Sequence, residues 1–288
     1  MNLLKYLFAL CAIAIFTVSC DKNNTPLNTD ELDLADDDAV TEAVFDDIFS
    51  NVDNATQALD LFFSKGEAAK GEIILSEGTC PIITVNIGDE TTWPKIITID
   101  FGDGCEGLYN QTRAGKIIIA VTGPRREEGS TRTVTFENYF FNGIGVQGTK
   151  VTENLGANDN GNVVFSASLT GGLITLPNDT TIAREFSRER EWIAGYDTWN
   201  IWDDECLVTG FANGTTYKGA TYENKITSAL HWKRVCKFIV SGVIEINRSG
   251  IEAFELDYGD GECDAIAVLR RGTEEKEITL RHKHRKFR

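Results

Sequence analysis

Two periodicities of hydrophobic residues divide the chain. Over residues 38–64, apolar side chains recur at spacings of three and four with aspartates between them, which predicts an amphipathic helix that packs on a sheet or docks in a partner's groove. Beyond residue 65, short runs rich in Val, Ile, Thr and aromatic residues alternate with Gly, Asn and Asp. Thirteen such runs, from 82–87 to 277–281, predict a mainly β fold: an antiparallel sandwich, a barrel-like sheet or an extended meander.

One predicted strand, 181–192, is polar on both sides. Its arginines share one face with two aromatic residues, and its glutamates share the other. The first face carries Arg184, Phe186, Arg188, Arg190 and Trp192, and the second carries Glu185, Glu189 and Glu191. Both faces of this strand must therefore contact water, as they do at a sheet edge or beyond a core.

The first 19 residues have a third pattern. Lys5 precedes an uncharged apolar run, Tyr6–Val18, which is typical of a secretory signal peptide and too short to span a bilayer. The ending Val18-Ser19-Cys20 resembles the lipobox of bacterial lipoproteins, in which the cysteine is acylated and becomes the first mature residue. The resemblance implies a signal peptide over 1–19 and a lipid anchor at Cys20. The alternative is an ordinary cleaved signal followed by an incidental cysteine.

The segment that follows, 20–37, has no apolar periodicity and predicts a flexible, acidic tether. The lipobox, the tether and the β-rich body together resemble uncharacterised envelope lipoproteins of Bacteroidota-type bacteria. That resemblance carries no known activity. It implies attachment to a membrane of the cell envelope, with the outer membrane expected, on either the periplasmic or the surface side.

An internal repeat follows from the string D-[FY]-G-D-G, which occurs at 100–104 and 257–261. A cysteine precedes the first aspartate of each copy, by 20 residues in one and 21 in the other, and each copy has a second cysteine just after it and an Arg-x-Gly further on. This agreement predicts two related β halves, 65–190 and 191–288.

The cysteine spacing predicts two disulfides. In an antiparallel hairpin, residues equidistant from the turn face each other. The midpoints of Cys80 with Cys105 and of Cys236 with Cys263 both fall at turn-forming segments, so each pair meets at the open end of its own hairpin. Secretion places the chain where disulfides can form. Cys206 is then left unpaired, and the spacing lacks the C-x₂-C of a zinc site.

The repeated strings also concentrate carboxylates in glycine-rich turns. Asp100 and Asp103 in one copy, and Asp257 and Asp260 in the other, are weak candidates for a Ca²⁺ site, because Ca²⁺ takes six to eight oxygen ligands from such loops. The simpler interpretation is that each Asp accepts backbone N–H bonds in its turn. Apart from this Ca²⁺, we expect no cofactor.

Four aromatic residues within eleven positions, Trp192, Tyr196, Trp199 and Trp202, precede three acidic residues. Ring faces that stack on sugars, next to carboxylates that bind hydroxyls, indicate a possible glycan-binding surface. A β-sheet core also uses aromatic residues, so packing is the alternative.

Charge and catalytic motifs narrow the function classes. The net charge of −16 excludes a broad nucleic-acid surface, and removing Lys5 with the signal makes it −17. Only three histidines and no G-x-S-x-G elbow are present. We therefore expect a lipid-anchored, non-enzymatic envelope protein with a structural or ligand-binding role, whose partner is a glycan or another envelope protein. The alternative is a carbohydrate-active hydrolase that uses a carboxylate pair.

Overall fold

The computed structural model describes residues 44–45, 48, 51–53, 55–60, 71–74, 80–88, 93–107, 111–198, 200–236 and 238–280. The predicted signal peptide, Cys20, the tether and Trp199 lie outside these described residues. In the described part of the chain, none of the helical residues belongs to a helix with the length and apolar composition needed to cross a bilayer.

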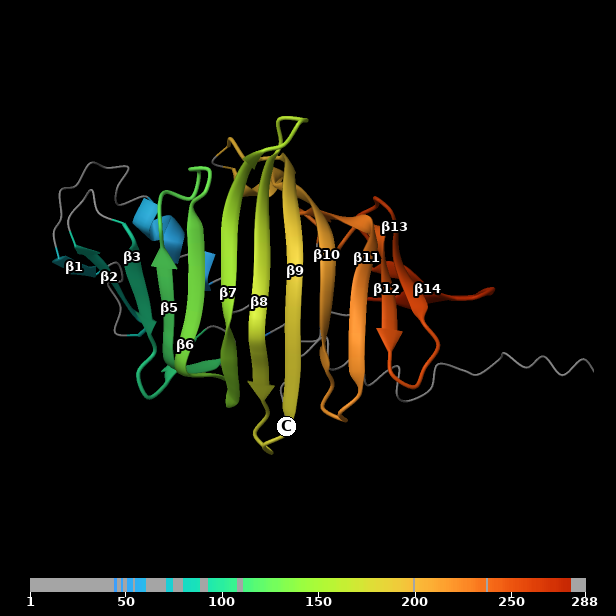
Figure 1. Ribbon diagram of the computed structural model, residues 1–288, viewed down its shortest axis with the longest axis horizontal. Helices are drawn as coiled ribbons and strands as arrows, with labels where there is room; N and C mark the ends of the chain where they lie inside the picture. Colours follow the sequence, from blue (N-terminus) through green and yellow to red (C-terminus); the bar gives the residue numbers. More distant parts are fainter. Residues whose placement is uncertain are drawn as a thin grey trace, which may run out of the picture.

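The strands form one open antiparallel sheet, in which neighbours follow the order of the chain except that β4 pairs only with β5 (Figure 1). The mainly β, antiparallel fold predicted from the sequence is confirmed, in its extended-meander form. The strands are β1 (Gly71–Ile74), β2 (Ile82–Gly88), β3 (Lys95–Asp100), β4 (Cys105–Glu106), β5 (Thr112–Val121), β6 (Thr131–Phe141), β7 (Ile144–Ala157), β8 (Val163–Thr175), β9 (Thr181–Ala194), β10 (Glu205–Thr215), β11 (Thr221–Lys233), β12 (Ser241–Arg248), β13 (Phe254–Asp260), β14 (Ile266–Arg271) and β15 (Glu274–Thr279).

The helix predicted from 38 to 64 is present in part. Residues 44–45, 48, 51–53 and 55–60 are helical, and their apolar side chains are buried against one face of the sheet. We call this the helix-bearing face. Ile97, Ile117 and Ile119 are fully buried on it, because alternate residues of β3 and β5 point to the same side. Burial of each such side chain contributes about 1.5–3 kcal/mol.

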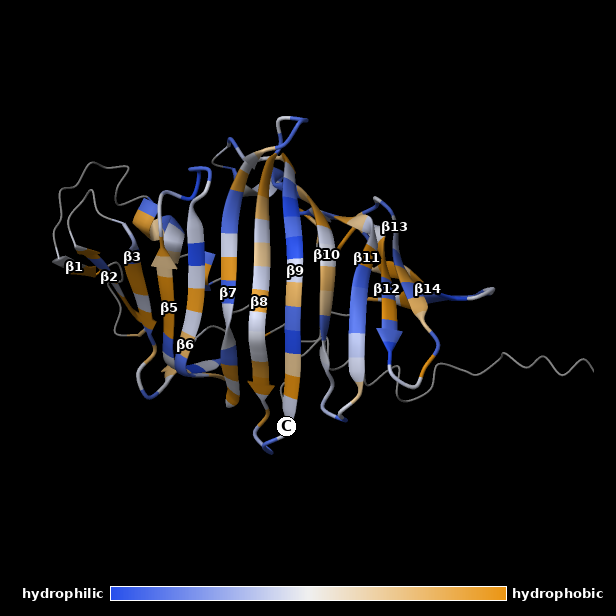
Figure 2. Ribbon diagram, viewed as in Figure 1, coloured by the Kyte–Doolittle hydropathy of each residue, from blue (hydrophilic) through white to orange (hydrophobic). Residues whose placement is uncertain are grey.

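The main core is densest in the N-terminal part of the sheet and extends to Phe186 of β9 and Ala212 of β10. In Figure 2, β3 and β5 are mostly hydrophobic, whereas hydrophilic residues interrupt β7 and dominate the upper part of β9. A second, smaller cluster is formed by Tyr222, Ile246 and Phe254 near the other end. Strand β9 lies in the middle of the sheet, between β8 and β10. Ile182 and Phe186 of β9 belong to the main core and Arg184 is buried, so only the part of β9 beyond Phe186 is polar on both faces. The edge position that the sequence also allowed is wrong.

The two copies of the repeat occupy corresponding places near the two ends of the sheet. Cys80 and Cys105 flank β2 and β3 with their Cα atoms 5.8 Å apart, and Cys236 and Cys263 flank β12 and β13 with theirs 5.2 Å apart. The structure thus brings each predicted pair within disulfide distance.

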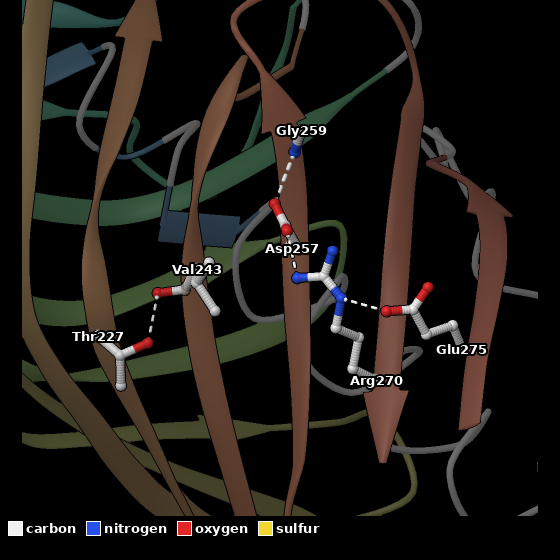
Figure 3. A network of polar contacts seen from close by, with 6 residues as sticks. All are labelled: Thr227, Val243, Asp257, Gly259, Arg270 and Glu275. Carbon is white, nitrogen blue, oxygen red and sulfur yellow. Dashed lines mark hydrogen bonds and ion pairs between the residues drawn. The ribbon is translucent and has the colours of Figure 1, made fainter. Parts of the chain in front are cut away.

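The first aspartate of each repeated string has the same two contacts. Asp100 accepts a hydrogen bond from the Gly102 N–H at 2.8 Å and pairs with Lys116 on β5 at 3.0 Å. Asp257 accepts from the Gly259 N–H at 2.9 Å and pairs with Arg270 on β14 (Figure 3). These aspartates therefore act as turn acceptors with a cation on the next strand.

Candidate functional site

Cationic side chains replace aliphatic ones on the helix-bearing face where it crosses β6 to β9. Arg132 lies two positions before the buried Val134 on β6, and Lys150 faces Val134 directly from β7. On β9, Arg188 and Arg190 follow the buried Phe186 at even spacing and so share its face. The alternation that builds the core thus continues into a row of positive charge.

A pair of arginines lies above this row, in the turn between β5 and β6. The guanidinium of Arg125 is 5.8 Å from the ring centroid of Phe165 and 5.6 Å from that of Trp192. Arg126 lies 5.3 Å from the ring of Tyr196 and donates a hydrogen bond to the Tyr196 carbonyl at 2.9 Å. Guanidinium groups at these distances from aromatic rings make cation–π contacts.

The aromatic rings at this point form one group, which we call the arginine–aromatic cluster: Arg125, Arg126, Phe165, Trp192 and Tyr196. The Tyr196 ring lies 6.1 Å from Phe165 and 6.0 Å from Trp192. Its hydroxyl is buried and has no hydrogen-bond partner among the described residues. A buried hydroxyl without a partner costs about 1–3 kcal/mol.

The buried Asn154 of β7 holds the arginine turn in place. Its side-chain amide donates to the Arg125 carbonyl at 3.0 Å, and its carbonyl oxygen accepts from the Gly156 N–H at 2.8 Å. The turn that presents both guanidinium groups is therefore anchored to the sheet.

The helix contributes two carboxylates to the same region. Asp53 pairs with Arg132 at 2.9 Å. The Asp53 side chain is 66% exposed. Partial desolvation by the surrounding protein raises its pKa, but the charges of Arg132, Lys150 and Arg125 outweigh this effect and hold that pKa below its usual value. Partial desolvation also raises the pKa of Asp60, seven residues further along the helix, and there the arginines offset it only in part.

Lys150 has the most perturbed charge of the row. Burial lowers its pKa to about 7, and although Asp53 favours the charged form, Arg132, Arg190 and Arg188 oppose it. Burial is the largest cause and the three neighbouring arginines add to it, so the amine is only partly protonated near neutral pH.

This perturbation predicts a pH dependence of stability. Between pH 7 and 10.5 the unfolded chain keeps the Lys150 proton while the folded chain has lost it, so the free energy of unfolding should rise as the pH rises through this window. We expect Lys150→Met to raise the free energy of unfolding at pH 7 by about 1–2 kcal/mol and to flatten the slope. Urea denaturation between pH 6.5 and 9.5 measures both. Lys225→Met, an exposed position on the opposite face, is the control, and an unchanged slope in Lys150→Met would contradict the assignment.

The predicted glycan-binding residues are only partly brought together. Trp192 and Tyr196 are half-buried and belong to the arginine–aromatic cluster. Trp202 is 62% exposed. Among the described residues, its ring contacts no ring of this cluster. Trp199 lies outside the described residues. Of the acidic neighbours, Asp203 accepts a hydrogen bond from the Thr198 hydroxyl at 2.9 Å.

The weak Ca²⁺ candidates do not gather into a site in the part of the chain that is described. No group of three or more His, Cys, Asp or Glu residues there could hold a metal ion. Asp100 and Asp257 already accept backbone N–H groups and pair with cations, as the simpler interpretation of the strings expects.

Cys206 is unpaired and fully buried, and burial raises the pKa of its thiol to about 12. His231 lies 2.8 Å from Glu205 on the neighbouring strand, where the two side chains bridge β10 and β11.

Sequence reasoning missed Arg125, Arg126 and Lys150 as site residues. The two arginines stand in a turn, Gly123-Pro124-Arg125-Arg126, and Lys150 is one polar residue in a strand rich in them. The usable signal was the arginine face of strand 181–192, because unbalanced cations on one face of a strand indicate a charged surface.

Comparisons with protein-family models, with curated proteins and with solved structures found no match, so the geometry described above carries the functional argument alone.

Proposed function

We propose that this protein is a lipid-anchored, non-enzymatic envelope protein that binds glycans at the arginine–aromatic cluster. The lipobox-like sequence at Cys20 supports the anchor. Mass spectrometry of the mature protein from its native host tests it, because an unmodified Cys20 thiol or an intact leader would contradict acylation.

The single observation that carries the binding proposal is the packing of Trp192 and Tyr196 against Arg125 and Arg126 at the rim of the helix-bearing face. Half-buried rings offer an apolar face on which a pyranose can stack, and guanidinium groups donate hydrogen bonds in a fixed fork to its oxygens. The buried Tyr196 hydroxyl adds a polar atom whose hydrogen-bonding capacity a sugar hydroxyl can satisfy.

We expect the secreted Cys20→Ser chain to bind a subset of glycans on an array, and Trp192→Ala to weaken that binding at least tenfold. Phe211→Ala is the matched control, because Phe211 is an accessible aromatic residue that lies on the opposite face, and its removal should change affinity less than twofold.

Tyr196→Phe separates a binding role from a packing role. Removal of an unsatisfied buried hydroxyl should leave the free energy of unfolding unchanged or raise it, whereas it should weaken glycan binding. If no glycan binds, or if neither Trp192→Ala nor Tyr196→Phe lowers the affinity, the protein has a structural role instead.

One observation favours a second candidate, the hydrolase. Asp53 and Asp60 are separated by two turns, about 10 Å along a helix, and their pKa values are shifted in opposite directions. Such divergence is typical of an acid–base pair. Binding is the better supported function, because the rings and guanidinium groups of the cluster offer contacts to a sugar, whereas only the opposite pKa shifts point to an acid–base pair. New reducing ends after incubation with the bound glycans would favour the hydrolase.

A further inference from the structure

We propose that the glycan is acidic, and that its carboxylate or sulfate groups bind along a cationic row formed by Arg132, Lys150, Arg188 and Arg190 while one sugar stacks at Trp192. This inference rests on the proposed function and specifies the ligand of the same site.

The register of the strands gives the row its shape. Arg132 faces Thr152, Thr152 faces Ala167, and Ala167 faces Arg188, so two arginines are separated by small side chains across four strands. Neighbouring strands lie about 4.8 Å apart, which places the two arginine Cα positions about 14 Å apart. Because the side chains between the two arginines are small, a ligand can lie across the strands from one arginine to the other.

A second line of paired residues across β7, β8 and β9 joins this row to the arginine–aromatic cluster. Asn154 faces Phe165, and Phe165 faces Arg190. Two positions further along β9, on the same face, is Trp192. A stacking surface thus continues directly into the cationic row, as an oligosaccharide that combines ring faces with charged groups requires.

The balance of charge points to an anionic ligand. Six cations interact with one another or with the nearby carboxylates among the described residues: the four of the row, Arg125 and Arg126. The carboxylates that interact with them are Asp53 and Asp60 on the helix and Asp204 beyond β9, whereas the glutamates of β9 lie on the opposite face. In a chain with a net charge of −16, a local group of cations in which burial and the neighbouring arginines together destabilise the Lys150 ammonium is a cost typical of binding sites.

An acidic saccharide fits this surface better than an anionic lipid. The pocket between the helix and the row, lined by Thr56, Asp60, Arg125 and Arg132, encloses about 20 Å³, room for about one water molecule. As the described residues define it, this pocket is too small to hold an acyl chain. Of the charged groups, Arg190 is exposed and Arg132, Lys150 and Arg188 are half-buried along the strand surface, which suits a ligand that carries its charges on successive sugars.

Paired probes test the inference. Oligogalacturonate and its methyl ester differ in carboxylate charge, and sulfated dextran and dextran differ in sulfate. We expect the Cys20→Ser chain to bind at least one acidic member tenfold or more tightly than its neutral partner, with an affinity that falls as salt increases. The pair that discriminates identifies carboxylate or sulfate as the recognised group.

The matched variants place the effect on the row. Arg188→Gln/Arg190→Gln should abolish the preference for the acidic probe, Arg190→Gln alone should reduce it severalfold, and Lys225→Gln on the opposite face should leave it unchanged. Thermal melting checks that each variant folds. If the double variant does not fold, the single variant Arg190→Gln tests the inference.

The outcomes distinguish the two proposals. Equal binding of charged and neutral partners, binding of neutral array glycans only, or an acidic preference that survives loss of Arg188 and Arg190 overturns the acidic-ligand inference and leaves the proposed function standing. Absence of binding to every glycan overturns both. Binding of anionic phospholipid vesicles in preference to the acidic saccharides overturns the inference in favour of a lipid ligand.

Discussion

Replacing Cys236 and Cys263 together by Ser should destabilise the C-terminal end of the sheet by about 3 kcal/mol. The two cysteines close a segment of 27 residues around β12 and β13, and a crosslink of this span restricts the unfolded chain by that amount. This end of the sheet has little else to hold it, because its hydrophobic cluster consists of Tyr222, Ile246 and Phe254 with a few partly buried neighbours. Local unfolding of β12 to β15 is therefore the expected consequence.

Hydrogen exchange resolved by peptide, together with urea denaturation, measures this effect. Amides of β12 to β14 should exchange faster in the variant, while those of β3 and β5 should keep their protection, because the main core and the helix cover those strands. Cys80→Ser/Cys105→Ser is the matched control at the other copy of the repeat, where the larger core should limit local opening. Free thiols on all four cysteines of the oxidised wild-type protein would contradict the pairing itself.

The sequence predicted the elements whose causes are local. Runs rich in Val, Ile, Thr and aromatic residues, such as 96–101 and 131–140, match β3 and β6. The helical spacing of Val44, Ile48, Val52 and Leu59 matches residues that are buried on the sheet. The cysteine pairing followed from hairpin symmetry, which depends only on the chain between the two cysteines.

What the sequence did not predict depends on contacts between distant segments. Strand β11 was missed, because its run Thr221–Lys233 is mostly polar and no local pattern separates a solvated strand from a loop. The open form of the sheet could not be chosen over a sandwich or barrel, because closure is decided by whether β1 meets β15. The arginine–aromatic cluster joins a turn near residue 125 to β9 and the residues after it, some 70 positions away.

The position of the site follows from how the core ends. Where the helix covers the sheet, alternate residues are aliphatic; beyond it the same alternation places Arg188 and Arg190. A single sheet that is longer than its covering helix must leave a wet surface, and charged residues on that surface keep a wide, flat sheet from pairing or aggregating. A structural role and a binding role would therefore both place charged residues on this surface. The unequal charge of the two faces is what favours binding.

The second large effect is expected at Gly115, where the two copies of the Arg-x-Gly motif differ. Gly115 sits at a bulge of β5 with φ at +78°, and a Cβ atom built there would lie 2.0 Å from the Asn138 carbonyl oxygen. Its backbone also exchanges hydrogen bonds with the repeated string, since the Gly115 N–H donates to Gly102 O and its carbonyl accepts from the Phe101 N–H, both at 2.9 Å. Gly115→Ala should therefore cost about 3–4 kcal/mol, from left-handed backbone strain and from forced separation of β5 and β6.

Gly272, the equivalent residue of the second copy, gives the matched control. Its φ is +57° in the turn between β14 and β15, but a Cβ atom there would meet nothing within 4 Å. Gly272→Ala should therefore show only the strain of the left-handed conformation, about 1–2 kcal/mol. Urea denaturation of both variants isolates the steric part as the difference between them. Equal costs at the two glycines would mean that β6 moves aside at the bulge, and that the first repeat is held less tightly against β5 than its paired hydrogen bonds indicate.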